Sequence, residues 1–224
     1  MIRLTGVRGI IARKMQESLQ QSAQLTFSCD CNASQLVSAR ADWKARGVPV
    51  GYEDLIAYSL VRVLADFPSF NAIETEKGVE IIQAVHLACA IGLDSGLVAP
   101  AIFDAQAKSL AEITACRRDL VDRARRGKLT IAEMTGGTIS ISNLGLTCVD
   151  HFTPILNRPQ QAIFGFGRIR QAAVVSEDGQ IVVGSVMGVS LTIDHRVHDG
   201  AAAGAFLTAL VDRLHYVEDG FAEK

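Results

Sequence analysis

The sequence has few cysteines, no excess of charge of one sign and no long apolar run. Its 224 residues include five cysteines without a C-x-x-C pair, which argues against a disulfide framework and favours free thiols in a reducing compartment. The formal net charge of −2 does not suit a general binder of nucleic acid or of anionic membranes. No apolar run reaches transmembrane length and no signal peptide is visible, so we expect a cytoplasmic protein.

The composition that is present is an ordinary globular one, with 49% hydrophobic and 21% charged residues. The length suits one large domain, and no repeat, low-complexity tract or linker is visible. We therefore expect a single domain over residues 1–224. The only dense basic stretch lies at 117–128, and it has two interpretations, a solvated helix face and a docking surface for an anionic group.

Hydrophobic periodicity predicts helices early and late in the chain and strands mainly in its second half. Capping signals and helical spacing predict helices over about 6–22, 33–46, 53–66, 109–126, from 130 onward, and over 200–218. Alternation and short apolar runs predict strands over about 25–32, 79–83, 86–93, 97–103, 138–142, 162–175, 181–183 and 186–193. This order predicts the α/β class, an α+β sandwich with a mixed sheet flanked by helices.

The strand predicted at 186–193 leads into a segment dense in titratable side chains. Val189, Leu191 and Ile193 share one face, and His195 joins that face if the strand continues. A buried imidazole is costly unless the site needs a proton acceptor near neutral pH, although a hydrogen-bonded core histidine is the alternative. A metal site of His195, His198 and Asp199 is disfavoured, because one short loop supplies no separated further ligand. We expect no bound metal.

A second candidate segment alternates hydroxyl side chains with isoleucine. Thr138, Ser140 and Ser142 share one face of the predicted strand, and a turn follows at 143–145. One interpretation is a row of hydroxyls that simply faces solvent. No G-x-S-x-G elbow surrounds Ser142, which argues against a covalent serine nucleophile.

Three motifs occur in a fixed order along the chain. Residues 136–145 are GGTISISNLG, residues 152–165 are FTPILNRPQQAIFG, and residues 194–200 are DHRVHDG. In this order they closely resemble the catalytic domain of the dihydrolipoamide acyltransferases, the core subunits of 2-oxo acid dehydrogenase complexes. The resemblance covers nearly the whole chain and implies the fold of chloramphenicol acetyltransferase. Further matching segments lie at 4–15, 67–72, 92–100 and 108–110.

The resemblance implies acyl transfer between a dihydrolipoyl thiol and coenzyme A. His195 matches the general base, which takes the proton of a thiol whose pKa is ordinarily ~8.5. Ser142 matches the hydroxyl that stabilises the tetrahedral oxyanion. Asp199 matches the carboxylate of the motif and also stands where the last helix would have its N-cap. We expect it to hold the loop of His195, with Arg8 or Arg13 as candidate partners.

The coenzyme A site implied by the resemblance lies within 92–109 and includes Asp104, Lys108 and Ser109. A lysine beside a helix N-terminus suits a phosphate group. The alternative is a lysine that merely precedes an ordinary capping box.

The resemblance also implies partners. It implies a homotrimer with active sites between subunits, together with the dehydrogenase and dihydrolipoamide dehydrogenase components of a complex. The lipoyl group would be carried on a domain absent from this chain, which also shows no peripheral subunit-binding domain. The polar segment 218–224 predicts a trimer with weak or absent higher assembly.

The sequence departs from the family pattern after the serine strand, where Cys148-Val149 replaces a Gly-Gly pair. Because this place lies near Ser142, the acyl preference could differ, although acetyl is the group we favour. Two other functions stay open. One is a coenzyme A-dependent acetyltransferase that acts on a small hydroxyl compound, and the other is a core scaffold with little catalysis of its own.

Overall fold

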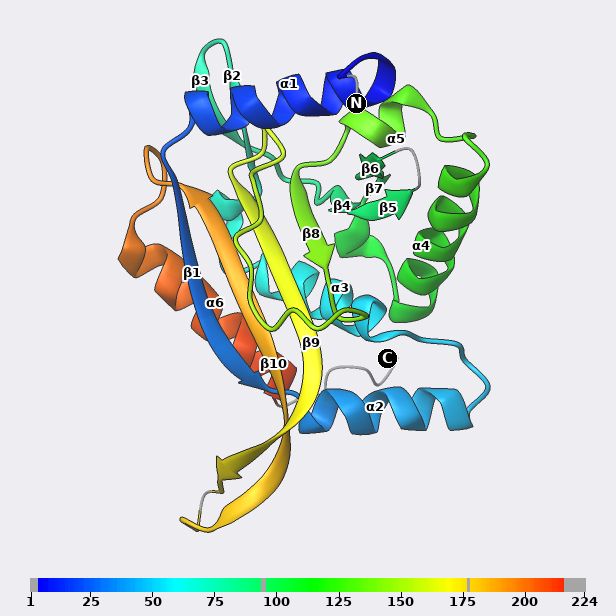
Figure 1. Cartoon of the computed structure of the whole chain (residues 1–224), viewed down its shortest axis with the longest axis vertical. Coiled ribbons are helices and arrows are strands. Elements are labelled where there is room, and N and C mark those ends of the chain that lie inside the picture. The colour runs from blue at the N-terminus through cyan, green and yellow to red at the C-terminus, as the bar shows by residue number, and fades with distance from the viewer. Residues whose placement is uncertain (1–3, 94–95, 177, 216–224) are drawn as a thin grey trace.

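The computed structural model describes residues 4–93, 96–176 and 178–215 (Figure 1). The helices are α1 (Gly6–Gln21), α2 (Ser34–Ala45), α3 (Tyr52–Val63), α4 (Leu110–Arg125), α5 (Ile131–Thr135) and α6 (Gly200–His215), with short 3-10 turns η1 (Pro68–Phe70) and η2 (Ala105–Ala107). The strands are β1 (Gln24–Asn32), β2 (Ala72–Thr75), β3 (Gly78–Ile81), β4 (Leu87–Cys89), β5 (Ile91–Leu93), β6 (Gly96–Val98), β7 (Ala101–Ile102), β8 (Ile139–Asn143), β9 (Ala162–Val175) and β10 (Ile181–Asp194). The segment 218–224, on which the prediction about higher assembly depends, lies outside the described residues.

The main sheet is mixed, as the sequence predicts. It has six strands in the order β1-β10-β9-β8-β4-β7. β8 runs parallel to both β4 and β9, whereas the β1–β10, β9–β10 and β4–β7 pairs are antiparallel. Two small antiparallel hairpins, β2–β3 and β5–β6, lie beside it. The α/β class with a mixed sheet flanked by helices is therefore confirmed.

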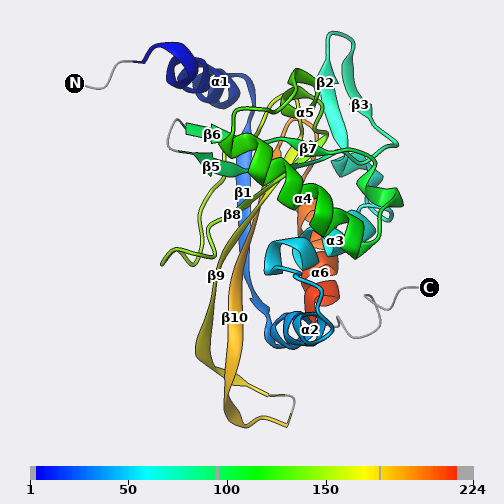
Figure 2. The ribbon, with the colours of Figure 1, turned by 90° about the vertical axis from the view of Figure 1, so that its right-hand side faces the viewer.

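Helices cover one face of the main sheet. α2, α3, α4 and α6 lie on that side, and α1 runs across one end of the strands (Figures 1 and 2). The apolar face of β10 is buried beneath this layer, and Val189, Leu191 and Ile193 each have 0% exposure. Burial of such side chains is the main source of folding free energy, roughly 1.5–3 kcal/mol each.

An aromatic cluster lies between the main sheet and this helix layer, and it is formed by Phe67, Phe70, Phe164, Phe206 and His198. Phe206 of α6 stacks on Phe67 with ring centroids 4.9 Å apart and meets Phe70 and Phe164 edge to face. His198 stacks on Phe70 at 4.2 Å. The cluster thus connects α6, η1 and β9 to the loop that follows β10.

The other face of the sheet is covered by the segment 144–161, which crosses in front of β8 and β9 (Figure 1). The backbone of this segment approaches the sheet closely. A Cβ atom at Gly167 or at Gly188 would collide with the carbonyl oxygen of Asp150. Glycine is required at both positions because only it leaves room for a backbone at that distance.

Four predicted runs differ from the observed strands. The run 97–103 divides into β6 and β7, which pair with β5 and β4 respectively. The run 86–93 divides into β4 and β5, because β4 pairs with β7 and β8 whereas β5 pairs only with β6. The runs 181–183 and 186–193 form one strand, β10, whose register shifts between Met187 and Val189. An apolar run does not reveal where pairing changes, and Gly188, which interrupts the alternation, marks the bulge.

β9 and β10 continue past the rest of the sheet as a two-stranded ribbon. The pairing of β1 ends at Asn32 with Val186, and the pairing of β8 ends at Asn143 with Phe166. Beyond these points the two strands pair with each other only, and they project from the sheet (Figure 2). Exposed apolar side chains near the tip are Val175, Ile181, Val182 and Val183.

Candidate active site

The loop that carries His195 begins where β10 ends. The His195 amide donates to the carbonyl of Ala23 at 2.8 Å, which fixes its backbone against the start of β1. The preceding Asp194 is buried, and its carboxylate accepts hydrogen bonds from the Ala23 amide and from both the amide and the guanidinium of Arg196. Although burial raises the pKa of Asp194, these hydrogen bonds outweigh it and lower the pKa below its ordinary value.

The prediction that the ring of His195 is buried is wrong, because His195 is exposed in this chain. The strand stops at Asp194, whose carbonyl accepts the amides of Val197 and His198, so the chain turns before the apolar face continues. His198 occupies the buried place instead, with 5% exposure. The role of His195 as a general base stays a prediction.

The ring of His198 is held by stacking on Phe70. Its Nε2 atom is buried and has no hydrogen-bond partner among the described residues. Burial lowers the pKa of His198, and Asp194 and Asp199 only partly oppose that shift. Burial therefore favours the neutral form of the ring over the charged form.

Asp199 caps the final helix. Its carboxylate accepts the amide of Ala202 at 2.8 Å, and its carbonyl accepts the amide of Ala203 at 3.1 Å. The N-cap position expected from the sequence is confirmed. Neither Arg8 nor Arg13 forms an ion pair with Asp199 within the part of the chain described, so the expected arginine partner is not found in one protomer.

The hydroxyl row of β8 does not face solvent. Thr138 and Ser140 are buried, and Ser140 donates to Gln160 Oε1 at 2.5 Å. Ser142 is half-buried and lines a cavity of about 530 Å³. This cavity is mostly apolar, and its polar lining includes Asn157 besides the two serines. Its remaining lining residues are Ile10, Ile11, Lys14, Met15, Ala90, Leu97, Val98, Ala99, Met134, Phe152, Pro154, Ile155 and Ile163.

His195 and Ser142 of one protomer lie too far apart to contact one reacting carbonyl. Ser142 pairs with Gly165, and Gly165 pairs with Ser190, so His195 lies two strands away and further along β10. At about 3.4 Å per residue and about 4.8 Å between strands, the separation is roughly 17 Å along and roughly 10 Å across the sheet.

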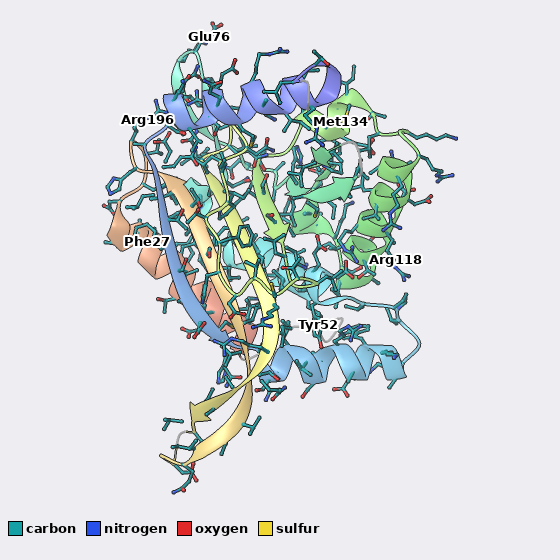
Figure 3. All side chains as sticks on the ribbon, viewed as in Figure 1. Phe27, Tyr52, Glu76, Arg118, Met134 and Arg196 are labelled. Atoms are coloured by element: carbon teal, nitrogen blue, oxygen red, sulfur yellow. The ribbon has the colours of Figure 1, made fainter. Side chains whose placement is uncertain are left out.

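The side-chain view agrees with this separation. Arg196, next to His195, lies beside the C-terminal end of α1, whereas Met134, which lines the cavity with Ser142, lies near its N-terminal end (Figure 3). The sequence brings the two candidate groups to one sheet but not to one site within a protomer.

The predicted coenzyme A residues lie together before α4. Asp104 adopts a left-handed conformation, with φ 50°, and its amide donates to His86 Nδ1 at 3.1 Å. Lys108 lines a second cavity, of about 230 Å³. Ser109 is the N-cap of α4, and the Glu112 carboxylate accepts from its amide and its hydroxyl at 2.8 and 2.9 Å. Because Glu112 takes these donors, the helix N-terminus is less available to a phosphate.

Sequence reasoning missed two polar connections around the candidate site. Arg196 donates to Glu74 at 3.2 Å, and Glu74 also pairs with Arg158 at 2.6 Å, which connects the His195 loop to β2. The charged residues beside the motifs indicated that ion pairs could form there. Their partners could not be predicted, because they are distant in sequence and belong to no recognisable motif.

Other features expected from composition can be compared with the described residues. All five cysteines are free thiols, and Cys31 packs into the core. Among residues 4–93, 96–176 and 178–215, no helix is long and apolar enough to cross a membrane. No group of three or more His, Cys, Asp or Glu side chains suits a metal ion in the same residues.

Residues 1–221 match the family model of the 2-oxoacid dehydrogenases acyltransferase (catalytic domain). The chain is 39% identical to the acetyltransferase component of the pyruvate dehydrogenase complex of Mycobacterium bovis, with 93% of this chain and 40% of the relative covered. It is 36% identical to the corresponding component of the acetoin cleaving system of Bacillus subtilis, with 93% and 54% covered. The chain therefore spans about half the length of these curated relatives.

Solved structures agree with this match. The dihydrolipoamide acetyltransferase of Azotobacter vinelandii superposes with a TM-score of 0.93 at 28% identity, covering 98% of this chain and 93% of that one. In the Azotobacter vinelandii protein the catalytic roles of a serine, a histidine and an asparagine were investigated, and the histidine and the asparagine are four residues apart. A truncated core from Thermoplasma acidophilum gives 0.87 at 30% identity, with 96% and 97% covered.

A chloramphenicol acetyltransferase superposes with a TM-score of 0.57 at 17% identity, covering 95% of this chain and 98% of that one. At that identity the likeness concerns the fold alone, and it confirms the predicted fold type. The match over 1–221, the motifs in order and the shared architecture lead to one conclusion. The chain belongs to the family of 2-oxoacid dehydrogenase acyltransferase catalytic domains.

Proposed function

We propose that this chain transfers an acetyl group between a dihydrolipoyl thiol and coenzyme A, in a site built from two protomers. The observation that carries the proposal is the separation of His195 and Ser142 on the sheet of one protomer. A neighbouring copy can bring its His195 to the Ser142 cavity of the first. A closed ring of three protomers repeats this contact without free ends.

The proposed chemistry starts at the thiol. The neutral imidazole of His195 takes the thiol proton, and the thiolate attacks the thioester carbonyl. The carbonyl oxygen becomes an oxyanion, to which the Ser142 hydroxyl donates a hydrogen bond. Such a donor commonly contributes 10²- to 10³-fold in rate, about 2.7–4 kcal/mol. Collapse then breaks the bond to the departing thiolate, which takes the proton back from the imidazolium of His195.

The other predicted site residues have supporting roles in the proposed reaction. Asp199 stands four residues after His195, at the spacing of the histidine and asparagine studied in the Azotobacter vinelandii protein, and it caps α6 beneath the loop. Lys108 is our candidate for a phosphate of coenzyme A, with Asp104 and Ser109 shaping the same turn. The mostly apolar cavity beside Ser142 suits an extended thiol arm such as dihydrolipoyl or pantetheine.

Acetyl is the acyl group we propose, because the relatives from Bacillus subtilis and Mycobacterium bovis are acetyltransferase components. A structure of the cubic core of the pyruvate dehydrogenase multienzyme complex superposes with a TM-score of 0.90 at 28% identity. We accordingly propose dehydrogenase and dihydrolipoamide dehydrogenase components as partners, a homotrimer as the unit, and the cytoplasm as the compartment.

The first test is acyl transfer from several acyl-coenzyme A donors to free dihydrolipoamide. We expect one preferred donor, a loss of several orders of magnitude in His195→Ala, and a loss of about 100-fold or more in Ser142→Ala. Ser176→Ala, at the exposed tip of the ribbon, is the matched control and should keep wild-type rates. A folded trimer without turnover on any donor would contradict the proposal and favour a scaffold or another acceptor.

A further inference from the structure

A side-chain amide, that of Asn157, lines the cavity beside Ser142. It belongs to the segment 144–161, is half-buried, and shares the cavity wall with Ser140, Ser142 and mostly apolar residues. Its backbone is fixed as well, because its carbonyl accepts the amide of Gln160 at 3.2 Å. Asn157 therefore presents a held polar group to surroundings that offer few polar partners.

The contact with Ser140 determines how the Asn157 amide is oriented. Ser140 Oγ donates its one hydrogen to Gln160 Oε1 at 2.5 Å, so toward Asn157 it can only accept. The amide nitrogen of Asn157 is therefore the atom that faces Ser140 Oγ, at 3.4 Å. The carbonyl oxygen of the same amide, Oδ1, accepts no hydrogen bond from residues 4–93, 96–176 or 178–215.

The free Oδ1 atom favours a ligand that brings a donor into the cavity. A polar atom in apolar surroundings is unfavourable when it has no hydrogen-bond partner. The group that satisfies it is an N–H, and a secondary amide supplies one without a charge that the apolar walls would have to accommodate.

The distance to Ser142 indicates which substrate amide can reach Asn157. Ser140 and Ser142 lie two residues apart on one face of β8, which is about 7 Å. In acetyl-coenzyme A two methylene groups separate the sulfur from the first amide of the pantetheine arm, so its nitrogen lies about 5 Å from the thioester carbon. The amide of a dihydrolipoyl arm lies beyond a longer aliphatic chain. A thioester at Ser142 therefore brings the pantetheine amide, and not the lipoyl amide, close to Asn157.

The position of Lys108 agrees with this direction of the arm. Neighbouring residues of α5 line the two cavities, Glu133 the cavity of Lys108 and Met134 the cavity of Ser142. The two cavities thus adjoin at α5. A coenzyme A molecule with a phosphate at Lys108 can extend its pantetheine arm from there into the Ser142 cavity.

We infer that Asn157 is a specificity-determining residue, whose Oδ1 atom accepts the N–H of the first pantetheine amide of coenzyme A. The inference rests on the proposed function, in which Ser142 binds the thioester carbonyl and Lys108 a phosphate. The alternative is that Asn157 only fixes Ser140 and the shape of the cavity wall. Recognition predicts an effect that requires the N–H of the substrate, whereas a structural role predicts the same effect with or without it.

The test compares coenzyme A with an analogue in which an ester oxygen replaces this N–H. Calorimetry measures the binding of both, and acyl transfer to dihydrolipoamide is measured with their acetyl forms. We expect wild type to bind coenzyme A about 10-fold more tightly than the analogue, with a similar ratio in kcat/KM. In Asn157→Ala this preference should disappear, because coenzyme A loses its acceptor while the analogue loses no hydrogen bond.

Two further variants separate recognition from a structural role. Ser140→Ala removes the partner of the Asn157 amide nitrogen but leaves Oδ1, and it should keep the preference for coenzyme A. Thr153→Ala is the matched control, because Thr153 is exposed in the same segment and does not line this cavity.

Equal affinities of wild type for the two ligands, binding of neither, or a preference that survives in Asn157→Ala would overturn the inference. A wild-type chain that binds coenzyme A with the expected preference but transfers no acyl group would instead overturn the proposed function. The recognition of the amide would then stand, because the binding measurement does not depend on activity.

Discussion

His198 places an imidazole inside the aromatic cluster, where a proton would be poorly accommodated. Its pKa is lowered, first by burial and against the opposing charges of Asp194 and Asp199. The unfolded chain takes up this proton near the ordinary pKa of about 6.5, whereas the folded chain resists it to lower pH. Above the pKa that His198 has in the unfolded chain, this residue does not reduce the free energy of unfolding. As the pH falls from that value through the lower pKa of the folded chain, the free energy of unfolding decreases.

We predict that the free energy of unfolding decreases as the pH is lowered from about 7 to about 5. His198→Phe should remove most of the contribution that His198 makes to this pH dependence. Phenylalanine keeps the stacking on Phe70 but cannot take a proton. Urea unfolding at several pH values measures the effect. Thr208→Ala is a control because this side chain is exposed and does not titrate. An unchanged pH slope in His198→Phe would contradict the prediction.

At the residue scale the sequence named candidate residues but could not predict the surroundings of their side chains. The motif residues His195 and Ser142 could be named from pattern and resemblance, and the N-cap position of Asp199 is confirmed. The exposure of His195 could not be predicted, because it depends on the turn around the Asp194 carbonyl. The contact of Arg196 with Glu74 joins residues 122 positions apart, and nothing in either local pattern indicates the other.

At the scale of the element, α6 begins with the Asp199 cap. Asp199→Ala removes the acceptor of the Ala202 amide and should lower the free energy of unfolding by about 1 kcal/mol. Asp199→Asn keeps a side-chain acceptor and should stay within a few tenths of a kcal/mol of wild type. Chemical denaturation of both variants measures the difference, and equal losses in the two would argue against capping.

The same helix is anchored through Phe206, whose ring is fully buried among three other phenylalanines. Phe206→Ala should reduce the free energy of unfolding by about 3–5 kcal/mol, because it removes apolar contacts and leaves a cavity. Thr208→Ala, two residues further on the exposed side of α6, is the matched control and should have little effect. Thermal unfolding of the two variants separates these outcomes. A small loss of unfolding free energy in Phe206→Ala would mean that neighbouring side chains move in to fill the cavity.

Elements with one uniform pattern were predictable, including the short strand β8 and the short helix α5, whereas strand partners were not. The helices α1 and α4 and the strand β9 have bounds within about two residues of those expected. The β4–β5 division and the union of two runs into β10 depend on which strand lies alongside, which is a tertiary property. Element type thus follows from local periodicity, while strand partners require the whole sheet.

At the scale of the whole molecule, a site shared between protomers has a consequence that can be measured by mixing subunits. His195→Ala and Ser142→Ala chains, each inactive alone, should regain activity when they are unfolded together and reassembled. In a random one-to-one mixture about a quarter of the interfaces pair an intact histidine with an intact serine, if each subunit makes the same head-to-tail contact. Mixing without reassembly is the control, and failure to recover activity would place both groups in one protomer.

The pairing of β1 with β10 imposes an order on the folding of this protein during synthesis. Gln24 lies opposite Asp194, 170 positions later in the chain. At roughly 10 residues per second of synthesis, β1 waits about 17 s for its partner. Contacts so distant in sequence form slowly, since a long loop must close before they contribute. The strand that completes the sheet also delivers the His195 loop, so the nascent chain acquires its candidate base only when its central sheet closes.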